Sequence, residues 1–224
     1  MDKNDKNYKR ILIGKRIAKE LKDGDYVNLG IGLPTEVVNH IPVGIKVVVQ
    51  SENGIIGVGP TPPVGEEDED LVNAGGGYIT AAPGSAYIDT AMSFAIVRGG
   101  HLAMTVLGAL QVDQHGNLAN WWIPGKMVPG MGGAMDLVSG ANQVVVAMEH
   151  CDKEGKSKIL KECTLPLTAT GKVTLIVTDM AVMKVEKGQL RLVEIAEGFT
   201  VDDVKQATEA DLIVEGEIPV FGVY

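Results

Sequence analysis

One carboxylate of this sequence, that of Glu52, is placed where it could act as a nucleophile or as a general acid or base. Three consecutive valines at 47–49 indicate a buried β-strand, because β-branched side chains suit a pleated, covered surface. Gln-Ser-Glu-Asn-Gly follows, in which Asn53-Gly54 is a turn pair because both residues tolerate positive φ. Glu52 is therefore predicted on a turn at the carboxyl end of a strand, where open α/β sheets bind ligands.

A second interpretation is that Glu52 is a solvated turn residue, as an arbitrary glutamate after a strand usually is. Its surroundings weaken this interpretation without removing it. Gly57 and Gly59 carry no side chains, so another molecule could approach the backbone closely beside Glu52. From its position alone, Glu52 is a candidate catalytic residue and no more than that.

Gly30 and Gly32 follow a predicted short strand at 26–29 and so belong to the same edge of the sheet as Glu52. Two glycines there allow close approach of a backbone or a ligand. They do not form a dinucleotide-binding fingerprint, since Thr35 replaces the third glycine and Pro34 stands where the helix should begin. We therefore reject a Rossmann-type cofactor site.

Gly132-Gly133 precedes a predicted helix that begins at Ala134 and ends at Gly140. Glycines at a helix N-terminus expose backbone N–H groups, which form a natural anion or oxyanion site. The alternative interpretation is tight packing of the turn.

Other polar residues are assigned structural roles. The acid run at 66–70 lacks the alternating ligands and the glycine of a calcium loop, so a solvated loop is the better interpretation. His115 lies in a predicted hairpin turn, and Glu149-His150 ends a predicted strand. We find no set of residues spaced for a metal ion, and no metal site is predicted.

Alternating strands and helices must position these residues. The strand at 26–29, a helix with Thr35 as its N-cap and the strand at 47–49 form a strand–helix–strand module, which builds parallel sheets through right-handed crossovers. Further elements are a helix at 8–22, a helix capped by Ser85 and ending at Arg98, strands within 102–112, 142–148 and 175–177, and a helix at 201–209. No linker divides the chain. We predict one domain, residues 1–224, with an open, mostly parallel α/β sheet flanked by helices.

Composition limits the kind of core, the binding partners and the compartment that this chain can have. Of 224 residues, 45% are hydrophobic and only 4% aromatic, as in the aliphatic core of a buried parallel sheet. The net charge of −9 argues against a nucleic-acid or anionic-membrane partner. Two cysteines make no disulfide framework. No signal-peptide core and no apolar run near the ~20 residues of a membrane span is present, so we expect a soluble cytoplasmic protein.

Five motifs, in matching order and spacing, resemble those of the B subunits of 3-oxoacid CoA-transferases. They are Ser51-Glu52-Asn53-Gly54, Gly30-x-Gly32-x-Pro34, the segment 132–138, Met148-Glu149-His150 and the segment 163–168. The resemblance extends from Ile11 to the region of Val214 and is greatest to acetate/butyrate–acetoacetate CoA-transferases. It implies the CoA-transferase fold, which is similar to that of sugar-phosphate isomerases.

In that family the glutamate of the Ser-Glu-Asn-Gly motif is the nucleophile, so the resemblance assigns this role to Glu52. It implies CoA transfer between a short-chain acyl-CoA, such as acetoacetyl-CoA, acetyl-CoA or butyryl-CoA, and a free carboxylic acid through a glutamyl-CoA thioester. Gly132 and Gly133 would make oxyanion or CoA contacts. Candidates for the substrate pocket are Gly30, Gly32, Ser51 and Asn53, of which the last two are equally suited to forming the turn. Coenzyme A is implied as a substrate, with no permanently bound cofactor.

The resemblance covers only the glutamate-bearing half of such enzymes. It therefore implies a separate A subunit of similar size, an active site at the A–B interface and an A2B2 heterotetramer. Two other classes are weighed against it. A sugar-phosphate isomerase would use an acid/base carboxylate with phosphate-binding loops, and a non-catalytic relative should tolerate loss of Glu52.

Overall fold

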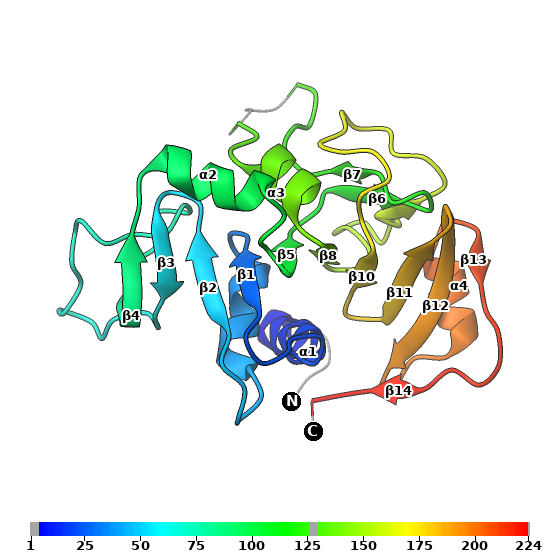
Figure 1. Ribbon diagram of the computed structural model, residues 1–224. Helices are drawn as coiled ribbons and strands as arrows, with labels where there is room; N and C mark the ends of the chain where they lie inside the picture. Colours follow the sequence, from blue (N-terminus) through cyan, green and yellow to red (C-terminus); the bar gives the residue numbers. More distant parts are fainter. Residues whose placement is uncertain (1–4, 126–129, 224) are drawn as a thin grey trace.

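The computed structural model describes residues 5–125 and 130–223, within which most strands join one 11-stranded sheet (Figure 1). In chain order these strands are β1 (Tyr26–Leu29), β2 (Val48–Ser51), β3 (Ile55–Val58), β4 (Ala81–Tyr87), β5 (Met104–Leu107), β8 (Gln143–Ala147), β10 (Leu175–Val177), β11 (Ala181–Glu186), β12 (Gln189–Ala196), β13 (Leu212–Ile213) and β14 (Val220–Phe221). Their order across the sheet is β13-β12-β11-β10-β8-β5-β1-β2-β3-β4, and β14 pairs with β12. A small sheet has the order β7-β6-β9, formed by β6 (Gln111–Asp113), β7 (Leu118–Ala119) and β9 (Ile159–Leu160).

The centre of the main sheet is parallel, which confirms the predicted fold class. β10, β8, β5, β1 and β2 all run in one direction, and β5 and β10 are buried along their whole length. Antiparallel pairs extend the sheet on both sides, through β3 and β4 beyond β2 and through β11 and β12 beyond β10. The carboxyl ends of the parallel strands therefore lie at one edge of an open sheet.

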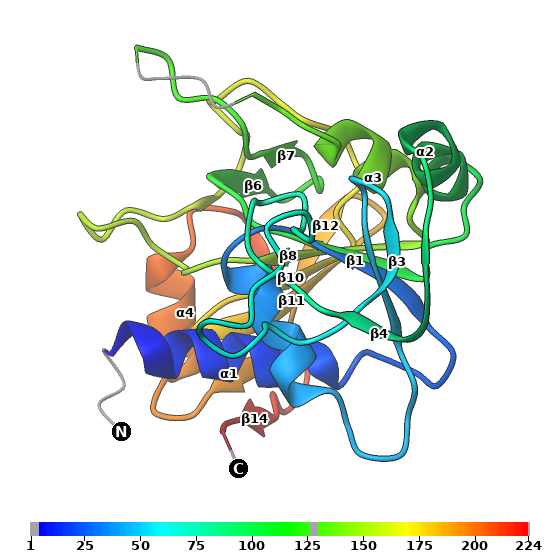
Figure 2. The same ribbon diagram turned by 90° about the vertical axis from the view of Figure 1, so that its left-hand side faces the viewer.

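Helices cover both faces of the sheet (Figures 1 and 2). α1 (Lys6–Ala18) and the 3₁₀ helix η1 (Leu33–His40) lie on one face, where Ile13, Ile17 and Val37 join one apolar core. On the other face lie α2 (Thr90–Arg98), α3 (Ala134–Gly140), α4 (Val201–Ala207) and the small sheet, where Leu137 and Val204 join a second core.

Two predicted helix caps are wrong. η1 begins at Leu33 with Gly32 at the cap position, while the Thr35 hydroxyl donates to the Gly32 carbonyl at 2.8 Å. Ser85 does not cap a helix, because it lies in β4, which pairs with β3. Asp89 caps α2 instead, and its carboxylate accepts a hydrogen bond from the Met92 N–H at 2.7 Å.

Two further boundaries differ from the sequence prediction. α1 spans Lys6–Ala18 rather than 8–22, because the Asp5 carboxylate accepts from the Asn7 N–H and starts the helix earlier. The strand predicted at 47–49 begins at Val48, whose side chain is 36% exposed. That strand is thus buried on both faces only from Val49 onward.

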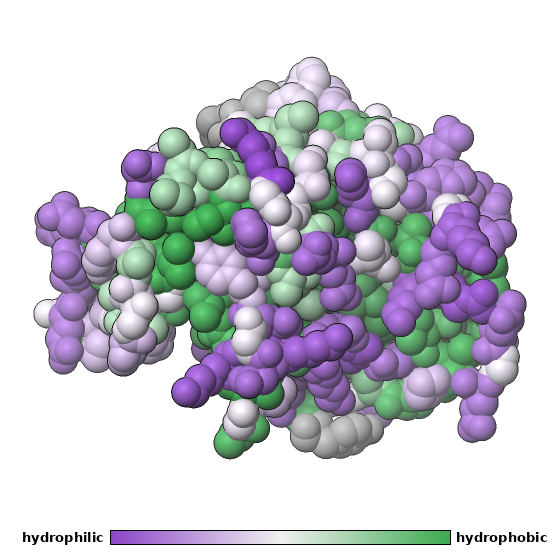
Figure 3. Space-filling view, in the orientation of Figure 1, coloured by the Kyte–Doolittle hydropathy of each residue, from purple (hydrophilic) through white to green (hydrophobic). Residues whose placement is uncertain are grey.

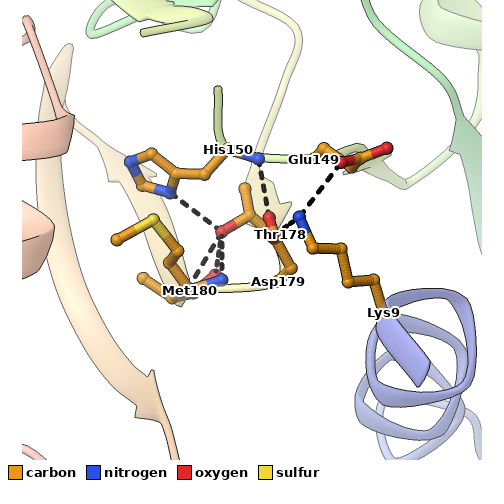
Figure 4. Close-up of polar contacts among 7 residues, drawn as sticks. Lys9, Glu149, His150, Thr178, Asp179 and Met180 are labelled. Carbon is orange, nitrogen blue, oxygen red and sulfur yellow. Dashed lines mark hydrogen bonds and ion pairs between the residues drawn. The ribbon is translucent and has the colours of Figure 1, made fainter. Parts of the chain in front are cut away.

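His150, three residues after the end of β8, joins three parts of the chain, and Figure 4 shows its contact with Thr178. Its ring is fully buried, with Nδ1 2.9 Å from Thr178 Oγ1 and Nε2 2.9 Å from Thr208 Oγ1. Burial lowers the pKa of His150 to about 4, although the charge of Asp179 acts in the opposite direction. The neutral ring therefore joins β8 to the segment after β10 and to the end of α4.

We predict that the His150 ring stays unprotonated from pH 7 down to pH 5. In the unfolded chain the ring binds a proton near pH 6.5, whereas the folded chain binds it only near pH 4. Stability is therefore lost as the pH falls from 6.5 to 4, by about 3 kcal/mol for this residue. An NMR pH titration of the His150 ring checks this prediction. Protonation of the His150 ring near pH 6.5 in the folded protein would contradict the prediction.

Within the described part of the chain, none of the helices has the length and hydropathy to cross a membrane.

Candidate active site at the carboxyl edge of the sheet

Glu52 lies on the tight turn between β2 and β3, as its sequence predicts, and its side chain is half-buried. The Gly54 N–H donates to the Ser51 carbonyl at 3.0 Å, which closes the turn. Gly54 has φ of 127°, and a Cβ added there would collide with the Ile88 carbonyl oxygen. Glycine is thus required at this position, and the turn fixes the backbone from which Glu52 projects.

Asn28 of β1 holds the Glu52 carboxylate. Its amide Nδ2 donates to Glu52 Oε2 at 3.2 Å and to the Gln50 carbonyl at 3.3 Å. Asn28 is only 1% exposed, and the parallel register pairs it with Gln50 of β2. Strand pairing therefore sets the distance between the amide and the carboxylate.

Asn28 belongs to a buried polar row, which it forms with Gln50 and Thr105. Asn28 pairs with Thr105 of β5 as well as with Gln50, so the three side chains project from the same face of the sheet. Gln50 Nε2 donates to Ser93 Oγ of α2 at 2.8 Å, and Ser93 is itself fully buried. This row connects the turn that carries Glu52 to the helix above it.

Three atoms of the polar row, Asn28 Oδ1, Gln50 Oε1 and Thr105 Oγ1, have no hydrogen-bond partner among the described residues. Buried polar atoms in native proteins are nearly always paired, and exceptions require an explanation. Their position beside a half-buried carboxylate is typical of a functional site. The sequence motifs did not predict this row. The sequence feature that could have predicted it is Asn28, an amide residue within the otherwise apolar centre of the sheet.

Gly133 lies against Glu52. A Cβ added to Gly133 would come within 3.3 Å of Glu52 Cγ and 3.2 Å of the Phe94 ring. Gly133 takes the cap position of α3, as the sequence predicts, and Gly132 before it has φ of 55°. The structure thus brings Gly133, although far later in the sequence, into contact distance of the candidate nucleophile.

The other predicted pocket residues have different surroundings. Ser51 Oγ accepts from the Ala74 N–H at 2.9 Å, and Asn53 Nδ2 donates to the Val72 carbonyl at 2.7 Å. These two side chains anchor the loop around residues 72–74 onto the turn. The Gly30 N–H donates to the Val106 carbonyl at 2.8 Å, and a Cβ there would come within 3.0 Å of that oxygen. Gly32 has φ of 88°.

The described residues contain no group of three or more His, Cys, Asp or Glu side chains that could hold a metal ion. What the site does offer is a carboxylate that is positioned by an amide donor and bordered by a glycine turn at a helix start. Such an arrangement suits nucleophilic attack by Glu52 on a carbonyl carbon.

Comparison with known proteins agrees with this geometry. A family model described as Coenzyme A transferase matches residues 11–207. The beta subunit of the acetate CoA-transferase of Escherichia coli (strain K12) is 54% identical over 206 residues, which cover 92% of this chain and 94% of that protein. The B subunit of the succinyl-CoA:3-ketoacid coenzyme A transferase of Helicobacter pylori is 53% identical over 205 residues, which cover 92% and 99%.

Solved structures show the same fold. The acyl-CoA transferase YdiF from Escherichia coli O157:H7, in a thioester complex with CoA, has a TM-score of 0.74 and 20% sequence identity, covering 96% of this chain and 43% of that chain. The match to the family model and the identity to its members together show that the chain belongs to the coenzyme A transferase family, among proteins named as its B or beta subunits.

Proposed function

We propose that this chain is the glutamate-bearing subunit of an enzyme that moves CoA from a short-chain acyl-CoA to a free carboxylic acid through a thioester on Glu52. The observation that carries the proposal is the Glu52 carboxylate, held by Asn28 at 3.2 Å on a turn at the carboxyl edge of the sheet. Membership of the coenzyme A transferase family supports the same chemistry. CoA is a substrate here, and the proposal includes no permanently bound cofactor.

The proposed transfer begins at the thioester carbonyl. The Glu52 carboxylate attacks this carbon and the C–S bond breaks, which gives an acyl-glutamyl anhydride and the CoA thiolate. The thiolate then attacks the glutamyl carbonyl, forms glutamyl-CoA and releases the first acid as its carboxylate. The acceptor carboxylate attacks glutamyl-CoA, whose C–S bond breaks to give a new anhydride and the CoA thiolate. The thiolate finally attacks the acceptor's carbonyl, which forms the new acyl-CoA and releases the Glu52 carboxylate. Charge is conserved and no net proton is transferred.

Two groups of the chain support these steps. The Asn28 amide orients the attacking carboxylate. The backbone at Gly133 is the proposed oxyanion donor, which is supported by its closeness to Glu52, since a Cβ added at Gly133 would come within 3.3 Å of Glu52 Cγ. Removing one oxyanion donor typically raises a barrier by about 2.7–4 kcal/mol. The solved thioester complex of YdiF, which has the same fold, supports a covalent intermediate.

Two variants in one series test the roles of Glu52 and Asn28. In the complete enzyme we expect Glu52→Gln to lower kcat for CoA exchange between acetoacetyl-CoA and acetate by roughly 10⁴-fold or more, because an amide is no nucleophile. Asn28→Leu should lower kcat by about 10- to 100-fold, since Glu52 keeps its chemistry but loses its orientation.

Glu66→Gln is the matched control, because Glu66 is an exposed carboxylate of the acidic loop, and it should leave kcat unchanged. Steady-state kinetics with both substrates varied should give parallel, ping-pong lines. Wild-type-like exchange in Glu52→Gln would refute the proposed nucleophile. Isomerisation of a sugar phosphate without CoA exchange would instead support the isomerase interpretation.

We also propose a separate A subunit that covers this site. The relatives are named as B or beta subunits, and this chain covers only 43% of the YdiF chain. Hydrophobic residues gather over α2 and the neighbouring strands (Figure 3). Three large hydrophobic side chains, Tyr87 of β4, Met92 of α2 and Met135 of α3, are 53–66% exposed. β4, whose residues are mostly exposed, also forms an edge of the sheet. Exposed edges and apolar patches of this kind are typical of interfaces.

Size-exclusion chromatography of this chain with and without the A subunit, followed by a turnover assay, tests the partner. We expect activity only in the co-expressed complex, at the size of A2B2. Met92→Lys should weaken the complex, because it places a charge in a buried apolar contact. Val43→Lys, at a fully exposed position in the loop between η1 and β2, is the control. Full activity of this chain alone would contradict the proposal.

A further inference from the structure

α2 lies beside both parts of the proposed site, the Glu52 carboxylate and the Gly133 backbone. α2 and α3 contact each other and lie on the same face of the sheet (Figures 1 and 2). Two consecutive residues of α2 make the relevant contacts: Ser93 bonds to β2, and Phe94 lies against Gly133 at the start of α3. α2 therefore bridges the strand that leads to Glu52 and the helix that presents Gly133.

Ser93 fixes α2 to the strand that leads to Glu52. Its Oγ accepts a hydrogen bond from Gln50 Nε2 at 2.8 Å, and both side chains are fully buried. Gln50 lies in β2, two residues before Glu52. Breaking a buried hydrogen bond leaves its donor and its acceptor without partners, which costs free energy. A shift of α2 along β2 is therefore unfavourable.

Close packing fixes α3 against α2. A Cβ added to Gly140 of α3 would collide with the Val97 carbonyl oxygen of α2, so the two backbones approach each other directly at this point. Arg98 Nε also lies 2.7 Å from Asp136 Oδ1, although an exposed ion pair of this kind adds little stability. The backbone contact thus determines where α3, and with it Gly133, lies relative to α2.

Phe94 places a rigid ring next to both parts of the site. A Cβ added to Gly133 would lie 3.2 Å from Phe94 Cε1 and Cζ and 3.3 Å from Glu52 Cγ. The edge of the ring and the Glu52 side chain therefore border one small space beside the Gly133 backbone. The Arg98 guanidinium lies over the ring, 5.4 Å from its centroid, which favours this orientation of the ring. A planar ring has no internal rotation, so it cannot change shape as an aliphatic side chain can.

We propose that Phe94 is a positioning residue, which sets the separation between the Glu52 carboxylate and the Gly133 N–H. The inference rests on the proposed function, in which Glu52 attacks the thioester and Gly133 stabilises the oxyanion. A smaller side chain at position 94 would leave a cavity into which the Glu52 side chain or the first turn of α3 could move. A displacement of about 1 Å from the productive geometry can lower a rate by about 100-fold.

The alternative role for Phe94 is packing alone, and the two roles predict different results. If the ring only packs, its removal lowers the free energy of unfolding and leaves the reaction rate of the folded enzyme unchanged. If the ring positions Glu52 and Gly133, its removal lowers the rate of the chemical step in enzyme that is still folded and still binds CoA. The rate of glutamyl-CoA formation therefore separates the two roles.

The test measures how fast CoA adds to Glu52 in the complete enzyme, by mass spectrometry of samples quenched after mixing with acetoacetyl-CoA. We expect Phe94→Ala to lower this rate by about 10- to 100-fold, with the Kd of free CoA unchanged. Phe94→Leu, which keeps most of the volume without the ring, should give a smaller loss and serves if Phe94→Ala does not fold. Ile96→Ala is the control, because it removes a half-buried side chain from another side of α2. It should keep the wild-type rate.

A double-variant cycle with Gly133→Ala shows whether the ring acts through Gly133. Alone, Gly133→Ala should lower the rate of adduct formation by about tenfold, because its methyl group presses on the ring and on Glu52. In a Phe94→Leu background the same methyl group should cost about threefold or less, since part of the space that the ring fills is then free.

The outcomes separate this inference from the proposed transfer reaction. A wild-type rate of adduct formation in folded Phe94→Ala and Phe94→Leu, or additive losses in the double variant, would overturn the role of Phe94 and leave Glu52 as the nucleophile. The absence of any adduct in the wild-type enzyme would instead refute the proposed function of Glu52, and the role of Phe94 with it.

Discussion

The hydrogen bond from Asn28 to Glu52 is the contact on which the proposed site depends. It joins two neighbouring parallel strands, and its geometry follows from the pairing of Asn28 with Gln50. A carboxylate on an isolated turn would sample many orientations, and each would have to be restricted before it could attack a carbonyl. Here the restriction is built into the sheet, since moving the amide would require breaking the register of the strands.

The rest of the fold maintains this contact from both sides. Above the sheet, Ser93 of α2 accepts a hydrogen bond from Gln50, and α3 presents Gly133 to Glu52. Below the sheet, α1 packs on the apolar face and brings Lys9 to Asp179 and Glu149 after the parallel strands. The face of α2 and α3 thus holds the candidate carboxylate, and the face of α1 holds the ion pairs of Lys9.

Sequence patterns predicted the parallel centre and the position of Glu52, because both depend on local signals. Consecutive β-branched residues mark a buried strand, and Asn53-Gly54 marks the turn that follows. The contact of Gly133 with Glu52 followed from the family resemblance, since no local rule relates positions so far apart. Asn28, Gln50 and Ser93 were missed because their partnership is set by the lateral order of strands. Ser85 was misplaced because its capping preference competes with strand pairing to β3 and with a better cap at Asp89.

The role of Glu52 is tested most directly by the intact mass of this chain after the complete enzyme is incubated with acetoacetyl-CoA and no acceptor acid. We predict an increase equal to the mass of CoA less one water, mapped by peptide analysis to Glu52, absent in Glu52→Gln and lost when acetate is added. A folded, CoA-binding enzyme that transfers CoA without any such adduct on Glu52 would show that the glutamate is not the nucleophile.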